Sequence, residues 1–197
     1  LIEINNSLFE QITNYPENER VLTLGGDHSI AIGSVLAIQN RAHERNKRLG
    51  LVWLDAHADI HTPQTSASGN IHGMPLAVIL GSGHSQLTNI AKQSSFLEPN
   101  QVFHLGGRSI DSGEEELFYK SGIHYHTMAD IQKKSIEKII TSHLESFVAS
   151  VDEIHISFDI DAIDPQYAPG VSTPEEGGMT KQEALLTLKF LAQTGKV

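Results

Sequence analysis

A short apolar run, Leu49–Leu54 (LGLVWL), leads directly into the polar segment Asp55-Ala56-His57-Ala58-Asp59. Similar runs rich in Val, Ile and Leu recur at Val21–Leu24, Val102–Leu105 and Ile154–Phe158. Near-continuous apolar strands are typical of a parallel sheet that is buried on both faces. We therefore expect a strand at each of these runs, and a further, more polar strand at Gly122–Thr127.

The segments between these runs have the apolar periodicity of amphipathic helices. They cover Ile30–Asn46, Pro75–Gly81, Gln86–Gln93, Gly113–Lys120, Ile131–Ser150 and Thr180–Thr194. Thr180 and Glu183 have the spacing of a capping box before the last helix. Alternating strands and helices predict an α/β fold of three layers, with helices on both faces of a mainly parallel sheet. Because there is no internal repeat and no linker, we expect a single domain over residues 1–197.

The composition is that of a globular protein and excludes several classes. Apolar residues make up 39% of the 197 residues and charged residues 19%, which excludes collagen-like and low-complexity chains. The absence of cysteine excludes disulfides, thiolate metal sites and a cysteine nucleophile. A net charge of −10 argues against nucleic acids and anionic membranes as partners and favours a cationic small molecule or a metal. With neither a spanning apolar run nor a signal-like leader, a cytoplasmic protein is expected.

Candidate metal ligands follow three of the expected strands. They are Asp27 and His28 after the first run, Asp55, His57 and Asp59 after the second, and Asp159, Asp161 and Asp164 after the last. In doubly wound sheets, ligands bind beyond the carboxyl ends of the strands. Side chains two apart on an extended chain point to the same side, so Asp55 can converge with His57, and Asp159 with Asp161.

This set of side chains predicts a pair of metal ions. Without Asp27 and Asp164, the set contains four carboxylates and two imidazoles. These six side chains exceed what one small cation needs, but they suit two ions that share carboxylates. Oxygen ligands with a minority of imidazole favour Mn²⁺, with Fe²⁺, Co²⁺ and Ni²⁺ as alternatives. A single Asp after a strand is more often a helix N-cap or a turn former. Capping explains Asp27 and Asp164 better than it explains six Asp and His residues at three strand ends.

Three segments together resemble the ureohydrolase superfamily, and specifically the arginases. They are Gly25–Ser29, Asp55–Asp59 and Ser157–Pro165, and they have the order and register of the family's motifs. A fourth segment, Thr62–Pro75, resembles the arginase loop that grips the amino-acid end of the substrate, where agmatinases and formiminoglutamases differ. The resemblance implies an arginase/deacetylase-like α/β/α fold, in a chain that is truncated at both ends.

The resemblance also implies a role for each matching residue. One ion would be held by His28, Asp55, Asp59 and Asp159, and the other by His57, Asp55, Asp59, Asp159 and Asp161, both ions normally being Mn²⁺. The residues expected to bind the substrate are His61, Ser66, Ser68 and Asn70 at the α-carboxylate, Asp111 at the α-amino group, and Thr173 in the pocket lining. His72 matches the proton-shuttle histidine, and together with Asp59 it is the expected catalytic residue.

The reaction that the resemblance implies is the hydrolysis of L-arginine to L-ornithine and urea, as part of arginine metabolism and the urea cycle. A water that bridges two divalent ions is acidic enough to supply hydroxide for attack on the guanidinium carbon. His72 can carry the proton. We expect two Mn²⁺ per subunit, L-arginine as the small-molecule partner, no nucleic-acid or membrane partner, and a trimer or hexamer of the full-length protein.

Departures from the family's pattern keep other hypotheses open. His61 replaces a usual Asn, and Ser109 replaces a common Asp beside the α-amino site. The alternatives are an agmatinase or guanidinobutyrase, and a metal-binding protein without turnover, because the family's guanidinium-binding glutamate would follow the last residue given. A two-metal phosphoesterase is a weaker option, since its anionic substrate would meet a negatively charged site. Arg108 could orient a carboxylate, but a structural role as the ion-pair partner of an acidic side chain is favoured, and His104 is expected to be a structural or surface residue.

Overall fold

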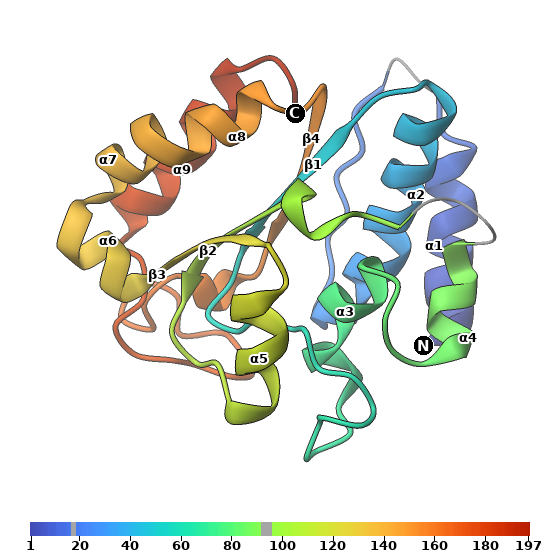
Figure 1. Cartoon of the computed structure of the whole chain (residues 1–197), viewed down its shortest axis with the longest axis horizontal. Helices are drawn as coiled ribbons and strands as arrows, with labels where there is room; N and C mark the ends of the chain where they lie inside the picture. The colour runs from blue at the N-terminus through green and yellow to red at the C-terminus, as the bar shows by residue number, and fades with distance from the viewer. Residues whose placement is uncertain (17–18, 92–95) are drawn as a thin grey trace. The chain divides into compact units, whose positions relative to one another are not determined.

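The computed structural model describes residues 1–16, 19–91 and 96–197. The chain forms two compact units (Figure 1). The first consists of Leu1–Leu49 and Asp59–Glu98, and the second of Gly50–Ala58 and Pro99–Val197. A division into compact units does not decide whether the chain folds as one domain, so the single domain stays a prediction.

The second unit is built on a four-stranded sheet with the strand order β3-β2-β1-β4 (Figure 1). Its strands are β1 (Leu49–Leu54), β2 (Val102–Gly107), β3 (His124–Thr127) and β4 (Glu153–Phe158). β1 pairs with β2, and β2 with β3, in parallel, which places Trp53 opposite His104 and His104 opposite Tyr125. Every residue of β1 and β2 is buried, as expected for strands that are covered on both faces.

Helices cover both faces of this sheet. They are α5 (Ser112–Lys120), α6 (Met128–Lys134), α7 (Ile136–Ile139), α8 (Glu145–Ala149) and α9 (Lys181–Gln193), with a π-helical turn, η5 (Ile140–Leu144), before α8. Leu105 of β2 shares a core cluster with Ile139 and Leu191. Its neighbour His104 instead contacts the ring of Phe118 in α5, edge to face at 4.8 Å. Because alternate side chains of a strand point to opposite faces, the predicted three-layer α/β arrangement is confirmed.

The first unit is helical. Its elements are α1 (Ile2–Thr13), η1 (His28–Ile30), α2 (Ala31–Glu44), η2 (Ile71–Gly73), α3 (Pro75–Ile79), α4 (Ser85–Thr88) and η3 (Asn89–Ala91). Phe9 and Leu36 belong to one core cluster that joins α1 and α2. The two helices approach closely at Gly33, where an added Cβ would lie 2.5 Å from the carbonyl oxygen of Asn5. Within the ranges that the structure describes, no helix combines the length and the apolar character needed to cross a membrane.

Several predicted elements need correction. Val21–Leu24 forms no strand with any described segment, and Leu22 and Leu24 are 82% and 84% exposed. An apolar run becomes a strand only where a neighbouring strand pairs with it. In place of the one helix expected over Ile131–Ser150 there are α6, α7, η5 and α8, and Ser135, with a positive φ of 68°, separates α6 from α7. Part of the helix expected over Gln86–Gln93 lies outside the described residues, and α4 and η3 cover the rest.

Candidate metal centre

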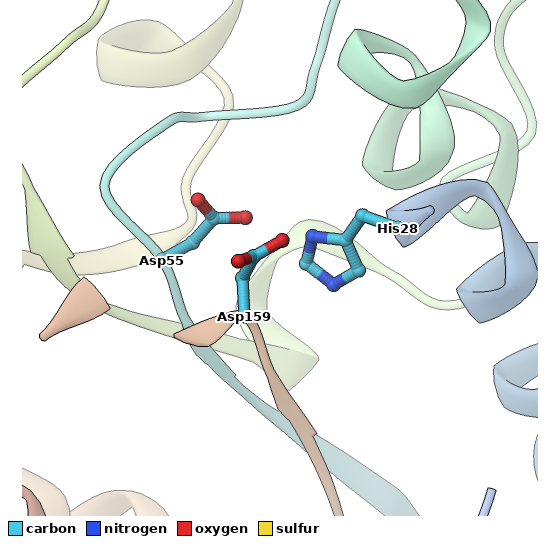
Figure 2. A group of neighbouring side chains, drawn as sticks. All are labelled: His28, Asp55 and Asp159. Carbon is cyan, nitrogen blue, oxygen red and sulfur yellow. The ribbon is translucent and has the colours of Figure 1, made fainter. Parts of the chain in front are cut away.

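Acidic side chains of the second unit gather at the carboxyl ends of β1 and β4. Asp55 follows β1 and Asp159 follows β4, and Figure 2 shows their carboxylates directed to the same side of the strand ends. The amide of Asp159 donates to the carbonyl of Leu54 at 2.9 Å, so the two strands end at the same level. His28, the third side chain labelled in Figure 2, belongs to the first unit.

His57 lies beside two buried carboxylates of the same unit. Its Nδ1 is 3.1 Å from Asp161 Oδ2 and 3.5 Å from Asp55 Oδ1. Asp55 and Asp161 are only 1% and 3% exposed. One donor atom from each of the three residues lies within 4.8 Å of the others, a spacing at which they can hold one metal ion.

The backbone of the two strand-end loops fixes these carboxylates. The amide of His57 donates to Asp55 Oδ1 at 2.8 Å, and the amide of Asp161 donates to Asp159 Oδ1 at 3.0 Å. The amide of Ala56 donates across the loops to Asp161 Oδ1 at 3.2 Å. Hydrogen bonds of this kind orient metal ligands before a metal binds.

Three further side chains hold the same group in place. Trp53 Nε1 donates to Asp55 Oδ2 at 2.9 Å, and Thr173 Oγ1 donates to Asp161 Oδ2 at 3.2 Å. His104 Nε2 donates to the carbonyl of His57 at 2.7 Å. The sequence did not predict that Trp53 and His104 form hydrogen bonds with this group. The position of Trp53 two residues before Asp55 on one strand is a signal that could have been used.

The electrostatics of this group suit a cation. Burial lowers the pKa of His57, but its hydrogen bonds to Asp161 and Asp55 and their negative charges outweigh burial and raise the pKa to about 11. The carboxylates beside His57 therefore favour a positive charge in this group. Carboxylate oxygens with one imidazole are a donor set that suits Mn²⁺ and similar divalent ions. The residues present thus fit a divalent metal.

The Arg108 guanidinium joins the segments that follow β2 and β4. It donates to the carbonyl oxygens of Asp161 at 2.6 Å, Glu175 at 2.8 Å, Gly106 and Glu176 at 3.2 Å, and Ala162 at 3.4 Å. Asp164 also stabilises the segment after Glu176, because its Oδ2 accepts hydrogen bonds from the amides of Gly177 and Gly178 at 2.8 and 3.1 Å. Arg108 therefore has a structural role, with carbonyl groups as its partners in place of the acidic side chain expected.

In the first unit, His28 and Asp59 form a pair. His28 Nδ1 lies 3.0 Å from Asp59 Oδ2, and both side chains are largely buried. Asp59 has a φ of 51°, a conformation that a residue other than glycine adopts only where its surroundings hold it. Its carbonyl accepts from the amide of Leu76 at 2.9 Å. Asp27 caps the turn that carries His28, since its Oδ1 accepts from the amide of Ser29 at 3.0 Å.

The loop before η2 carries most of the residues expected to bind the substrate. Ser66 Oγ accepts from the amide of Gly69 at 3.0 Å, and Ser68 Oγ accepts from the amide of Asn70 at 3.2 Å. The two hydroxyl oxygens are 3.5 Å apart. Gly69 has a φ of 71°, which allows the tight turn that brings them together.

The other expected site residues lie on both units. In the first unit, His61 Nδ1 lies 3.1 Å from Thr65 Oγ1. His72, on η2, is exposed, and its Nδ1 is 3.7 Å from Asp27 Oδ2. In the second unit, Asp111 is the N-cap of α5, where its Oδ1 accepts from the amide of Gly113 at 2.8 Å.

Comparison with known proteins agrees with these features. The sequence model of the Arginase family matches residues 3–197. The arginases of Bacillus caldovelox and Bacillus subtilis (strain 168) are 40% and 41% identical to this chain over 192 residues, which cover 97% of this chain and 63% of each relative. A crystal structure of Entamoeba histolytica arginase in complex with L-ornithine has a TM-score of 0.91 at 35% identity, covering 99% of this chain and 65% of that one.

The chain thus spans less than two thirds of the length of the relatives it matches. Within that span the family match runs almost from end to end, at an identity well above the level at which only the fold is shared. The resemblance found in the strand-end motifs is thereby confirmed, and this chain belongs to the arginase family.

Proposed function

We propose that the protein is a binuclear manganese hydrolase that cleaves L-arginine into L-ornithine and urea. The observation that carries this proposal is the buried group of Asp55, His57 and Asp161 in a chain of the arginase family. The related Entamoeba histolytica arginase was crystallised with L-ornithine, the amino acid that this reaction would release.

Two Mn²⁺ ions are the metals that we propose. By the family pattern, their ligands would be His28, Asp55, His57, Asp59, Asp159 and Asp161. Two divalent ions held by these residues would lower the pKa of a water molecule and so supply a nucleophile at neutral pH. The charges of the four carboxylates would balance those of two divalent ions.

Ser66 and Ser68 are proposed to bind the substrate α-carboxylate. Each hydroxyl oxygen already accepts a backbone amide, which leaves its own proton to be donated. Since the two oxygens are 3.5 Å apart, one carboxylate can accept from both. Asn70 and His61 can donate to the same carboxylate.

The remaining roles follow the family pattern. Asp111 would accept a hydrogen bond from the substrate α-amino group. Its position at the exposed N-terminal end of α5 leaves its carboxylate accessible. An exposed imidazole such as His72 can pass protons between solvent and an active site. This is the catalytic role that we propose for His72, and Asp59 is the other proposed catalytic residue. Thr173 would act through Asp161, to which it donates at 3.2 Å.

The test is urea release from L-arginine, agmatine and 4-guanidinobutyrate by the whole protein in the presence of Mn²⁺. We expect L-arginine to be preferred. Ser68→Ala should raise the KM for L-arginine and leave agmatine turnover unchanged, because agmatine has no α-carboxylate. A preference for agmatine would reassign the substrate to the agmatinase class. No turnover of any guanidine would contradict the hydrolase proposal and favour a metal-binding role.

We also propose that the protein is a cytoplasmic homo-oligomer, a trimer or hexamer, that acts in arginine metabolism without nucleic-acid or membrane partners. The support is the family resemblance and a net charge of −10, which disfavours binding to anionic polymers and lipids. Analytical ultracentrifugation of the whole protein would measure the mass of the assembly. A stable monomer at all concentrations would contradict the proposed oligomer.

A further inference from the structure

Glu175 lies beside three parts of the second unit. Its Oε1 accepts a hydrogen bond from Ser109 Oγ at 3.0 Å. The same oxygen is 3.8 Å from Nε2 of His57. Its carbonyl accepts from the Arg108 guanidinium at 2.8 Å. Both the backbone and the carboxylate of Glu175 are therefore held, although the side chain is 40% exposed.

Ser109 brings this carboxylate to the His57 imidazole. Ser109 and His57 face each other in an isolated parallel bridge beyond the ends of β2 and β1. The amide of Ser109 donates to the carbonyl of Ala56 at 3.0 Å, which fixes the two segments side by side. The backbone of Ser109 lies beside that of His57, and the Ser109 hydroxyl thus holds the Glu175 carboxylate next to the His57 ring.

The two nitrogens of the His57 ring face different carboxylates. Nδ1 faces Asp161 and Asp55, whereas Nε2 faces Glu175. An imidazole that binds a metal through one nitrogen keeps a proton on the other, and a carboxylate near that proton fixes the ring and increases its basicity. At 3.8 Å the interaction with Glu175 is a charge attraction, because a hydrogen bond is shorter.

We propose that Glu175 is a positioning residue for His57. Held by Ser109, its carboxylate stabilises the ring with the proton on Nε2, so that Nδ1 is presented to the metal. The inference rests on the metal site proposed above and adds to it a residue that binds no metal itself.

Glu176 offers a matched control. It is the next residue, it is exposed, and its carbonyl accepts from Arg108 at 3.2 Å. Glu175→Gln and Glu176→Gln each remove one negative charge from the same segment and leave these carbonyl contacts in place. Any difference between the two variants therefore reports on the position of the carboxylate beside His57.

Mn²⁺ binding to the wild type and to both variants would be measured by isothermal titration calorimetry. We expect Glu175→Gln to weaken Mn²⁺ binding by about tenfold, the lower end of the usual effect of losing a residue that orients a ligand. Glu176→Gln should leave the affinity unchanged. Ser109→Ala should weaken binding in the same direction, and the double variant with Glu175→Gln should lose no more than Glu175→Gln alone, since both changes remove one interaction.

A second readout follows the ring itself. With Zn²⁺ as a diamagnetic probe, the NMR signal of the His57 Nε2 proton should exchange with water faster in Glu175→Gln than in the wild type or Glu176→Gln. Equal Mn²⁺ affinities of the two Gln variants, or unchanged exchange of that proton, would overturn this inference alone. A wild type that binds no Mn²⁺ would overturn both this inference and the metal site on which it rests.

Discussion

Trp53 and Asp55 are two residues apart, and the indole Nε1 donates to Asp55 Oδ2 at 2.9 Å. Trp53 is fully buried on β1. Trp53, a side chain of the sheet core, therefore orients a candidate metal ligand together with the amide of His57, which donates to Asp55 Oδ1. Arg108 acts on the backbone, because its guanidinium donates to the carbonyl groups of Asp161 and Glu175 and so joins their two segments.

Trp53→Phe should weaken Mn²⁺ binding by about tenfold, because Asp55 loses the donor that orients it. It should also lower the free energy of unfolding by about 2 kcal/mol, from a lost buried hydrogen bond and a small cavity. Calorimetry and urea unfolding would measure the two effects. Phe103→Leu is the control, since Phe103 is as deeply buried but belongs to the core cluster with α6–α9. A loss of affinity in the control as large as in Trp53→Phe would contradict the account.

Arg108→Lys should lower the free energy of unfolding by about 2–3 kcal/mol, because one ammonium group cannot reach all the carbonyl groups that the guanidinium binds. Arg48→Lys is the matched control. Arg48 forms a surface ion pair with Glu98 at 3.6 Å, and its replacement should cost less than about 0.5 kcal/mol. Urea unfolding of both variants would measure the difference, and equal stabilities would show that Arg108 does not join these segments.

At the scale of elements, the sequence predicts best those features that depend on neighbouring residues. The apolar runs that became β1 and β4, and the capping box of Thr180 and Glu183 on α9, are confirmed. Val21–Leu24 is an apolar run like that of β1 but has no partner strand among the described segments, and pairing cannot be deduced from one segment alone. Helix α1 was missed because its Asn residues weaken the helical pattern.

The same limit applies to the site. The positions of Asp55, His57, Asp159 and Asp161 follow from local spacing at strand ends, and the structure brings them together within the second unit. The contacts of His104 and Glu175 join segments far apart in the chain. No periodicity or motif in one sequence reports which side chains meet across such distances.

His126, the buried side chain of β3, should make the stability depend on pH. Its ring lies 4.5 Å from that of His143 on η5. Burial lowers the pKa of His126 to about 4, assisted by the positive charges of His143, Lys134 and His124 and opposed by Asp130. The unfolded chain binds this proton near pH 6.5, so between pH 6.5 and about 4 it holds more protons than the folded chain. Stability should therefore fall as the pH falls through this range.

His126→Phe tests this element. The ring contacts are retained while the titrating group is removed. Over the same pH range, the free energy of unfolding of the variant should decrease by roughly 1–3 kcal/mol less than that of the wild type. Urea unfolding at a series of pH values would measure it. Parallel curves for the two proteins would contradict the lowered pKa.

At the scale of the whole molecule, a net charge of −10 and several buried carboxylates make the fold sensitive to divalent ions. Mn²⁺ at about 100 times its Kd should raise the free energy of unfolding by about 2.7 kcal/mol for each ion bound, and a chelator should reverse the effect. Scanning calorimetry would measure it. Asp161→Ala should abolish the part of the gain that comes from the ion proposed at Asp161 and His57, whereas Asp152→Ala, which removes an exposed carboxylate before β4, should retain the whole gain. Equal gains in the two variants would place the ions elsewhere.

The two metal ions proposed at the ends of β1 and β4 are tested most directly by crystals grown with Mn²⁺ and measured at the manganese absorption edge. We expect two anomalous peaks per chain, both within coordination distance of Asp55 and Asp159, with Asp161 and His57 at one of them. A single peak, or peaks away from Asp55 and Asp159, would contradict this proposal.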